Sequence, residues 1–347
     1  MPAIVDSSAI VLVTGANGFL GTWIVQQLLE KGYCVRAAVR NTAKGTYLQA
    51  RFKSYKQRLE IVIVEDMTKS NAFAHVVRGV DGIIHTASPV TTIADSPEEL
   101  TEPAVRGVTR ILESARDYGE RVGRIVITSS CAAILDTSDE EVTVSEDDWN
   151  DQRVRECEIH GRNAVGLAKY SASKVLAERA AWDFVRGSHE RISWDLTTIC
   201  PPYIFGPPIH DVESPDLLKS SSKLIYNALV NNNFAGVPPL ERPGHGWVDV
   251  RDVAAAHIKA LETPGAGGER ILLSAGSFVW QDFINSALSL PERIYRAHAA
   301  ATGPKPVKRR LITFKTEKAE RILGLRLLPL EDCIRDTLVD YAERGWY

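Results

Sequence analysis

The sequence has no long hydrophobic run, no cysteine framework and no excess of charge of one sign. No stretch of about 18 apolar residues occurs, so no membrane-spanning helix is expected. The N-terminus lacks the charged and apolar parts of a signal peptide. The 5 cysteines are scattered, without a Cys-x-x-Cys pair or a Cys/His cluster, which predicts no disulfide framework, no metal site and a reduced, cytoplasmic compartment. The formal net charge of −3 provides no basic surface for nucleic acid and no polybasic tail for a membrane.

Short apolar runs alternate with helical patterns along the 347 residues, which is enough chain for one large or two modest domains. Apolar spacing predicts helices over residues 20–28, 103–118 and 248–261. Short runs suited to burial on both faces predict strands at 9–13, 35–39, 59–64, 82–87, 124–128 and 194–199, with a weaker seventh candidate at 270–274. This alternation predicts an α/β fold with a doubly wound parallel sheet covered by helices.

The stretch Thr14-Gly-Ala-Asn-Gly-Phe-Leu-Gly21 joins the first predicted strand to the first predicted helix. Gly15, Gly18 and Gly21 form a Gly-x-x-Gly-x-x-Gly pattern. Such glycines let the backbone approach a pyrophosphate, which then meets the free N–H groups of the helix N-terminus. A tight turn without a ligand is the alternative, but the order of strand, turn and helix favours a Rossmann-type dinucleotide site.

The second predicted strand indicates which nucleotide binds. Enzymes that use NAD place an acid on the ribose hydroxyls about 20 residues after the glycine motif, whereas no acid occurs here between Glu30 and Glu60. Arg36 and Arg40 flank the end of this strand, and Lys44 follows. Arg40 should lie where the adenosine 2′-phosphate would bind, and a guanidinium suits phosphate. We therefore expect NADPH rather than NADH, with ordinary surface cations as the alternative.

The regular pattern breaks at paired prolines after about residue 200. We expect residues 1–202 plus 246–275 to form an NADP-binding Rossmann domain. Residues 203–245 plus 276–347 should form a smaller, discontinuous substrate-binding lobe. The acidic stretch from Asp136 to Asp151 is interpreted as a solvated excursion.

Tyr170 and Lys174, in Tyr170-Ser-Ala-Ser-Lys174, are four residues apart and therefore share one helix face. A cation beside a phenol lowers the pKa of the phenol, which lets it exchange a proton near neutral pH. Such pairs also occur by chance on helix surfaces. Combined with the glycine turn, this pair predicts a hydride-transfer enzyme with a proton-handling tyrosine.

Three motifs in this order, Thr14–Gly21, Thr128-Ser-Ser130 and Tyr170–Lys174, make the chain resemble the extended short-chain dehydrogenases/reductases. More narrowly, it resembles their dihydroflavonol-reductase-like branch, which includes yeast and fungal NADPH-dependent methylglyoxal, aldehyde and ketone reductases. The segments that carry this closer resemblance are Val11 to Arg40, Asp66-Met67, Ala177-Glu-x-Ala-Ala-Trp182 and Pro201-Pro-Tyr-Ile-Phe-Gly-Pro207. The resemblance is strong over residues 9–210 and weakens beyond 265.

The resemblance implies a catalytic set of Ser130, Tyr170 and Lys174. Ser130 would hydrogen-bond the substrate carbonyl oxygen, and Tyr170 would protonate the developing alkoxide. Lys174 would hold the ribose hydroxyls of the cofactor and keep the pKa of the tyrosine low. Ser129 competes for the serine role, but its place in the triplet favours Ser130. The implied reaction is the reversible reduction of an aldehyde or ketone, with NADPH as hydride donor.

The resemblance also implies contacts around the glycine turn and the ends of the strands. The expected cofactor set is Gly15, Asn17, Gly18, Phe19, Leu20, Arg40, Lys44, Asp66, Met67, Thr86, Ala87, Ser88, Thr128, Ser129, Tyr170, Lys174, Pro201, Tyr203, Ile204 and Ser222. The expected substrate set, which is mainly apolar, is Val90, Ser130, Cys131, Ala132, Leu135, Tyr170, Tyr203 and Trp247. His85 lies inside a buried predicted strand and is interpreted as a satisfied core histidine rather than a base.

A mainly apolar pocket suits a hydrophobic or aryl carbonyl substrate. Plant dihydroflavonol reductases carry an Asn five residues after the catalytic serine, where this chain has Leu135, so flavonoid reduction is not expected. Cys131 is interpreted as a packing residue, with an alkylatable thiol at the site as the alternative. A monomer and a homodimer both stay open.

Three other functions compete with carbonyl reduction. Sugar-nucleotide epimerases and dehydratases share the expected fold, but they usually keep NAD, which the surroundings of Arg40 disfavour. A 3β-hydroxysteroid dehydrogenase is a nearer alternative and stays open. NADP-sensing regulators typically lose the catalytic tyrosine or lysine, and this chain keeps both.

Overall fold

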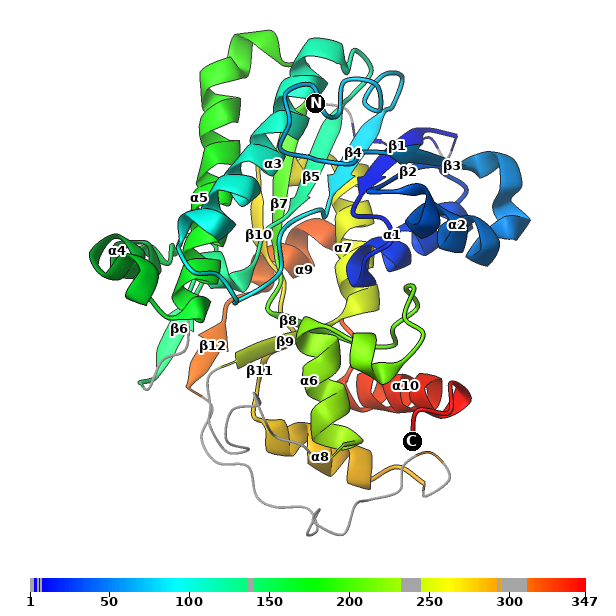
Figure 1. The fold of residues 1–347 in the computed structure, drawn as a ribbon, viewed down its shortest axis with the longest axis vertical. Coiled ribbons are helices and arrows are strands. Elements are labelled where there is room, and N and C mark those ends of the chain that lie inside the picture. Colours follow the sequence, from blue (N-terminus) through cyan, green and yellow to red (C-terminus); the bar gives the residue numbers. More distant parts are fainter. Residues whose placement is uncertain are drawn as a thin grey trace.

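The computed structural model describes residues 3, 4, 6, 8–135, 140–231, 245–291, 294 and 311–347. Within them, a parallel sheet with the strand order β10-β7-β5-β4-β1-β2-β3 forms the centre of the larger lobe (Figure 1). Its strands are β1 (Ile10–Thr14), β2 (Cys34–Val39), β3 (Leu59–Ile63), β4 (Gly82–His85), β5 (Arg124–Thr128), β7 (Asp195–Cys200) and β10 (Arg270–Leu272). Every predicted strand is confirmed, including the weaker candidate, and so is the doubly wound fold.

Side chains along each strand alternate between two apolar layers. Val11 and Val13 of β1 pack with α1 (Phe19–Glu30) and α7 (Val250–Glu262). Leu12 points the other way, toward α3 (Glu98–Tyr118) and α5 (Gly166–Ser188). Because both faces of the sheet are covered, its strands are uniformly apolar. The predicted helix 103–118 begins earlier, at Glu98, and includes its proline.

The smaller lobe lies below the sheet in Figure 1 and has its own aromatic core. Phe205, Phe278 and Phe283 meet there with ring centroids 4.7–5.6 Å apart. The lobe is built from β8 (Tyr203–Phe205), β9 (His245–Asp249), β11 (Ser277–Phe278), α6 (Ser220–Leu229), α8 (Trp280–Leu288) and α10 (Leu330–Glu343). The remaining elements are α2 (Thr42–Arg51), α4 (Asp151–His160), α9 (Glu317–Leu323), β6 (Val142–Val144) and β12 (Ile312–Phe314).

Two segments differ from what the sequence predicts. Ala319 and Leu323 of α9 belong to the apolar cluster of the larger lobe, although residues 276–347 were expected in the smaller one. The expectation of a solvated acidic excursion holds only in part: Glu140, Glu141, Asp147 and Asp148 are exposed, whereas Glu146 is buried and β6 pairs with β12. The first residues of that excursion, 136–139, lie outside the described part. The two-lobe division with its boundaries remains a proposal.

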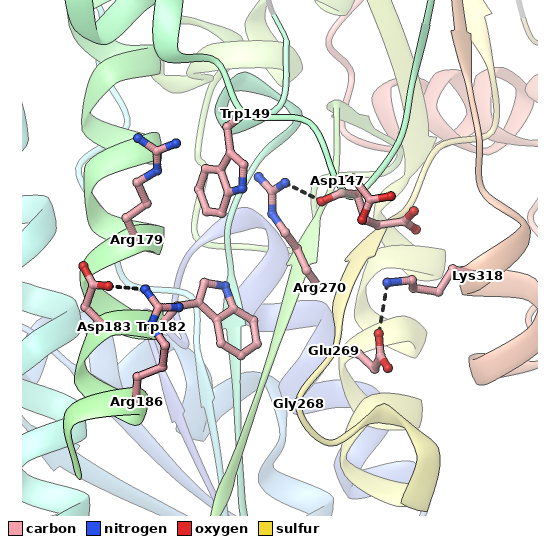
Figure 2. Close-up of a pocket in the computed structure, with 11 residues that line it drawn as sticks. Asp147, Trp149, Arg179, Trp182, Asp183, Arg186, Gly268, Glu269, Arg270 and Lys318 are labelled. Atoms are coloured by element: carbon pink, nitrogen blue, oxygen red, sulfur yellow. Dashed lines mark hydrogen bonds and ion pairs between the residues drawn. The ribbon is translucent and has the colours of Figure 1, made fainter. Parts of the chain in front are cut away.

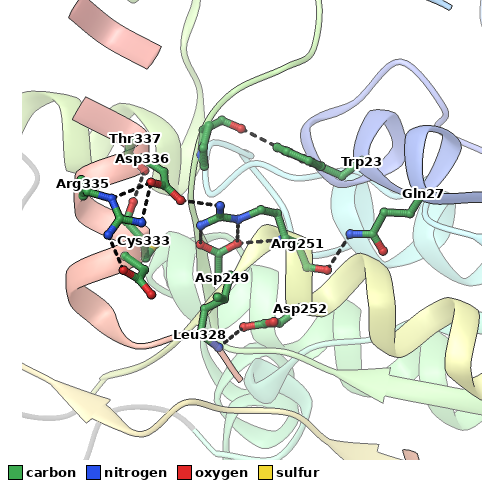
Figure 3. Close-up of polar contacts among 12 residues, drawn as sticks. Trp23, Gln27, Asp249, Arg251, Asp252, Leu328, Cys333, Arg335, Asp336 and Thr337 are labelled. Atoms are coloured by element: carbon green, nitrogen blue, oxygen red, sulfur yellow. Dashed lines mark hydrogen bonds and ion pairs between the residues drawn. The ribbon is translucent and has the colours of Figure 1, made fainter. Parts of the chain in front are cut away.

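An ionic cluster ties the smaller lobe to α7 (Figure 3). Arg251 donates to Asp249 at 2.8 and 2.9 Å and to Asp336 of α10 at 2.5 Å. One turn away, the Asp252 carboxylate accepts a hydrogen bond from the Leu328 amide at 2.8 Å. These bonds hold α10 against the helix that covers the nucleotide-binding sheet. Among the described helices, none combines the length and the apolar character needed to cross a bilayer.

Candidate active site

The glycine turn packs tightly against the end of β4 and the N-terminus of α1. Gly15 has a φ of +65°, and a Cβ there would lie 2.8 Å from the Thr86 hydroxyl oxygen. A Cβ on Gly21 would overlap the carbonyl oxygen of Gly15. Gly18 caps the helix without any side-chain hydrogen bond, and no acid occurs in its first turn. The first N–H groups of α1 are therefore suited to an anion such as a pyrophosphate.

The site lies where β1 and β4 are adjacent and the chain reverses its direction across the sheet. Such switch points collect ligands at the carboxyl ends of the strands. Thr86 donates to the Thr14 carbonyl at 2.7 Å, and the Ala87 amide donates to the Thr14 hydroxyl at 3.3 Å. Thr86 and Ala87 are thereby held beside the glycine turn, and their expected contact with the cofactor, with that of Ser88, stays a prediction.

His85 lies behind this turn in a buried position. Its Nδ1 is 2.8 Å from the Thr14 hydroxyl, whereas its Nε2 has no partner among the described residues. Burial lowers the pKa of His85 to about 3, and the charge of Lys174 adds to this effect. A neutral histidine fits the core role that the sequence suggests, although only one of its ring nitrogens is satisfied.

The predicted catalytic side chains come together between α5 and the loop after β5. The Ser130 hydroxyl lies close enough to the Tyr170 phenol to lower its pKa, and it accepts a hydrogen bond from the Ala132 amide at 3.1 Å. Lys174 Nζ lies 5.5 Å from the centroid of the Tyr170 ring and donates to the Ser88 hydroxyl at 2.8 Å. The arrangement thus links the proton-handling helix to the end of β4, where the cofactor is expected.

The titration of Tyr170 differs from the sequence-based expectation. Burial raises the pKa of Tyr170 to about 12, and the nearby Ser130 hydroxyl only partly opposes this. Burial also lowers the pKa of Lys174 to about 8. The prediction that Lys174 lowers the pKa of the phenol is therefore wrong for this structure, because desolvation is the larger effect.

The neighbours of Ser130 have other partners. Ser129 donates to the buried Glu178 carboxylate at 2.6 Å. Thr128 Oγ1 lies 2.7 Å from His257 Nε2, and His257 Nδ1 lies 2.7 Å from the Val253 carbonyl. Since Nδ1 must donate to that carbonyl, Nε2 accepts from Thr128. Of the three hydroxyls, Ser130 is the one that acts on the pKa of Tyr170, which favours it over Ser129 for the substrate.

Cations near the expected adenosine end differ in availability. Arg36 is used structurally, since it pairs with Glu60 at 2.6 Å and donates to the Val76 carbonyl. Arg40 is exposed, and its charge is one of the weaker influences that lower the pKa of Asp66. The stronger influences on Asp66 are its hydrogen bonds from Thr68.

Lys44 forms an ion pair with Asp211 of the smaller lobe at 2.9 Å. That bond places a segment from the smaller lobe over α2. Met67, the other residue expected near the adenine, packs closely over Gly107 of α3.

The expected substrate residues come from five segments: the chain after β4, the chain after β5, α5, β8 and β9. Tyr203 and Trp247 are register partners in β8 and β9. Cys131 packs after β5, where its thiol donates to the Cys200 carbonyl at 3.3 Å and burial raises its pKa. Ala132 and Leu135 are partly buried on the same segment, whereas Val90 is 58% exposed.

The remaining expected contacts surround β8. The Pro201 carbonyl accepts from the Cys131 amide at 2.9 Å, and the Ile204 carbonyl accepts from the Ser221 hydroxyl at 2.5 Å. Ser222 is buried in α6. Asn17, Phe19 and Leu20 lie in the turn and first residues of α1.

The sequence analysis missed Glu178, Arg270 and Asp211 as parts of the site. A signal for Glu178 was present, because it follows Lys174 by another four residues and so continues the Tyr170 face of the helix. Asp211 and Arg270 have no such signal, since both reach the site only through the tertiary fold.

Comparisons with known proteins agree with this geometry. Residues 11–275 match the NAD dependent epimerase/dehydratase family. An uncharacterized oxidoreductase of Schizosaccharomyces pombe is 39% identical over 346 residues, which is 98% of each chain. The NADPH-dependent methylglyoxal reductase of Saccharomyces cerevisiae is 32% identical over 338 residues, covering 94% of this chain and 96% of that protein.

A solved structure shows the same similarity. The crystal structure of yeast methylglyoxal/isovaleraldehyde reductase complexed with NADPH superimposes with a TM-score of 0.81 at 29% identity. The match covers 97% of this chain and 100% of the other.

Proposed function

Because this chain belongs to the NAD dependent epimerase/dehydratase family, within the extended short-chain dehydrogenases/reductases, we propose that it reduces an aldehyde or ketone to the alcohol with Tyr170 as proton donor. The chain is an NADP-dependent oxidoreductase, and its cofactor is NADPH. The observation that carries the proposal is the joining of Tyr170, Ser130 and Lys174 beside the glycine turn.

The residues present fit this cofactor. The N-terminus of α1, which has no side-chain cap and no acid in its first turn, suits the pyrophosphate. Arg40 and Lys44 are the cations proposed for the 2′-phosphate, with Lys44 exchanging its Asp211 partner for the phosphate. When bound, NADPH supplies the hydride that the carbonyl carbon receives.

The chain's own groups handle the proton and the charge on oxygen. With a pKa of about 12, the Tyr170 phenol is protonated at neutral pH and holds the proton that the reduced carbonyl oxygen needs. Ser130 orients that oxygen by hydrogen bonding. Lys174 places a positive charge beside the developing alkoxide and is buried enough for that charge to act strongly. The same groups operate in reverse for alcohol oxidation.

Two of the competing functions are less well supported. A sugar-nucleotide epimerase would need NAD and a cationic site for a second diphosphate, whereas an exposed arginine follows β2 and the expected substrate residues are apolar. A pure NADP sensor would not need Ser130 beside the Tyr170 phenol. The 3β-hydroxysteroid alternative differs only in the substrate, so a substrate panel separates it.

The test is turnover by the purified protein with NADPH and with NADH. The panel contains aryl ketones, aliphatic aldehydes, 1,2-dicarbonyls and a 3-ketosteroid, and loss of reduced-cofactor absorbance is followed. Tyr170→Phe should abolish turnover and retain NADPH binding. Tyr226→Phe is the matched control, since this phenol donates to the Trp346 carbonyl at 2.7 Å in the smaller lobe. Equal turnover by Tyr170→Phe and the wild type would refute the proposal.

A further inference from the structure

Glu178 is the third polar residue on the face of α5 that carries Tyr170 and Lys174. The three positions are spaced by four residues and therefore lie one above another along the helix. Glu178 is 2% exposed. Burying a carboxylate is unfavourable unless it is paired and hydrogen-bonded, so its partners indicate why it is there.

The partners of Glu178 come from the chain just after β5 and from the strands β7 and β10. Its carboxylate accepts from Ser129 at 2.6 Å and from Thr198 of β7 at 2.8 Å. Arg270, at the start of β10, donates to both carboxylate oxygens at 2.8 and 3.2 Å. One acid thus connects α5 to three neighbouring strands of the sheet.

Arg270 extends the connection to the segment between β6 and α4. It donates to the carbonyls of Glu146 and Asp148 at 2.7 and 2.5 Å. Its guanidinium lies 3.8 Å from the centroid of the Trp149 ring, at the wall of a surface cavity of about 410 Å³ (Figure 2). The charges around this cavity are largely paired with one another, as Lys318 is with Glu269, so Arg270 acts there as an anchor for the polypeptide.

We infer that Glu178 is a positioning residue, which holds Ser129 so that the adjacent Ser130 hydroxyl stays beside the Tyr170 phenol. Ser129 is fixed on its backbone side as well, since its amide donates to the Ile199 carbonyl at 2.8 Å. The catalytic serine and tyrosine come from different segments, and the Glu178–Ser129 bond joins those segments directly beneath them. This inference rests on the proposed reductase activity.

The magnitude follows from the sensitivity of catalysis to position. A displacement of about 1 Å can reduce a rate by about 100-fold. We expect Glu178→Gln, which keeps the shape but not the charge, to lower kcat by between about 10- and 100-fold. Ser129→Ala, which removes one hydroxyl, should lower kcat by about 10-fold. The affinity for NADPH should change less than about 2-fold in Glu178→Gln, because the bonds of this carboxylate go to Ser129, Thr198 and Arg270 and to no residue of the glycine turn.

A double-mutant cycle distinguishes positioning from general stability. If Glu178 acts through Ser130, then Glu178→Gln should have little further effect on kcat in a Ser130→Ala background. A merely structural role would reduce kcat by the same factor in both backgrounds. Should Glu178→Gln fail to fold, Ser129→Ala in the same two backgrounds decides the question.

The matched control is a buried ion pair at the opposite ends of the same strands. Arg124 of β5 pairs with Asp195 of β7 at 2.5 Å. Asp195→Asn should lower the thermal stability yet leave kcat per folded molecule unchanged. The inference is overturned if Glu178→Gln and Ser129→Ala keep kcat within about 2-fold of the wild type, or if their effects are equal in both backgrounds. Failure of the proposed reductase activity would appear separately, as turnover that survives Tyr170→Phe.

Discussion

We expect the buried charge of Lys174 to lower the free energy of unfolding of the protein. Burial lowers its pKa from the ordinary value of 10.5 to about 8, and it is 7% exposed. At about 1.4 kcal/mol per pKa unit, holding the charged ammonium in the folded state costs about 3 kcal/mol. Replacing Lys174 by Met removes this cost and also the charge-assisted hydrogen bond to Ser88, which is worth about 1.5–3 kcal/mol. Lys174→Met should therefore raise the free energy of unfolding by at most about 1 kcal/mol at neutral pH and abolish turnover.

The sign of the pH dependence follows from the same shift. Below pH 8 the lysine is protonated in both the folded and the unfolded chain, so the full cost is present. Between about 8 and 10.5 the unfolded chain binds more protons than the folded one, and the wild type gains stability relative to the variant. Above 10.5 both states are neutral at this position, and the advantage of the variant disappears.

The matched control lies on the same helix. Lys169 is 4% exposed, but its ammonium donates to the carbonyls of Ala94, Asp95 and Arg162 at 2.8–3.0 Å. Lys169→Met loses these charge-assisted bonds, each worth about 1.5–3 kcal/mol, and should therefore be destabilised.

The assay is urea unfolding followed by tryptophan fluorescence, without NADPH, near pH 7 and again near 10.5. The expected result is opposite signs for the two lysine variants at neutral pH. A Lys174→Met variant that is less stable than the wild type near pH 7 would refute the reasoning, as would an advantage that persists at the higher pH.

Three further results are expected. Gly21→Ala would make a methyl group overlap the Gly15 carbonyl oxygen and so distort the glycine turn. NADPH binding, measured by fluorescence titration, should be lost, and near-normal affinity would contradict the proposed binding of the pyrophosphate at this turn. Arg40→Ala should raise KM for NADPH by about 10- to 100-fold with KM for NADH unchanged, because a charged hydrogen bond is worth about 1.5–3 kcal/mol; an equal rise for both cofactors would count against the 2′-phosphate role. Mass mapping after N-ethylmaleimide treatment should find the partly exposed Cys34 modified before Cys131, whose burial raises its pKa, and the reverse order would restore the reactive-thiol alternative.

The elements of the larger lobe were predictable because their signals are local. Each strand is a short apolar run, and each buried helix has a regular apolar stripe, as in the run from Val11 to Val13 and its neighbours in α1. The Tyr170–Lys174 spacing is likewise a property of one helix. These patterns do not depend on knowing which distant segments meet.

The features that could not be predicted depend on tertiary contacts. The strand β6 pairs with β12, which follows it by about 170 residues. Local sequence patterns do not show a pairing between segments so far apart in the chain. The pKa of Tyr170 follows from how deeply the phenol is buried, which the residue spacing does not specify. Arg270 looked like the first residue of a strand, and its ion pair with Glu178 becomes visible only when β10 is placed beside β7.

One face of α5 connects the reacting groups to the sheet. Tyr170 meets Ser130 after β5, Lys174 meets Ser88 after β4, and Glu178 reaches Thr198 inside β7. The three strands are neighbours in the order β7-β5-β4, so the helix is fixed at successive levels against one rigid surface. The contributions of the charged residues to folding then differ in sign. Glu178 is fully paired and should stabilise the fold, whereas Lys174 has a single neutral partner and should destabilise it. A charge that opposes folding at this position fits the catalytic role that we propose for Lys174, and the lysine variants measure that opposition.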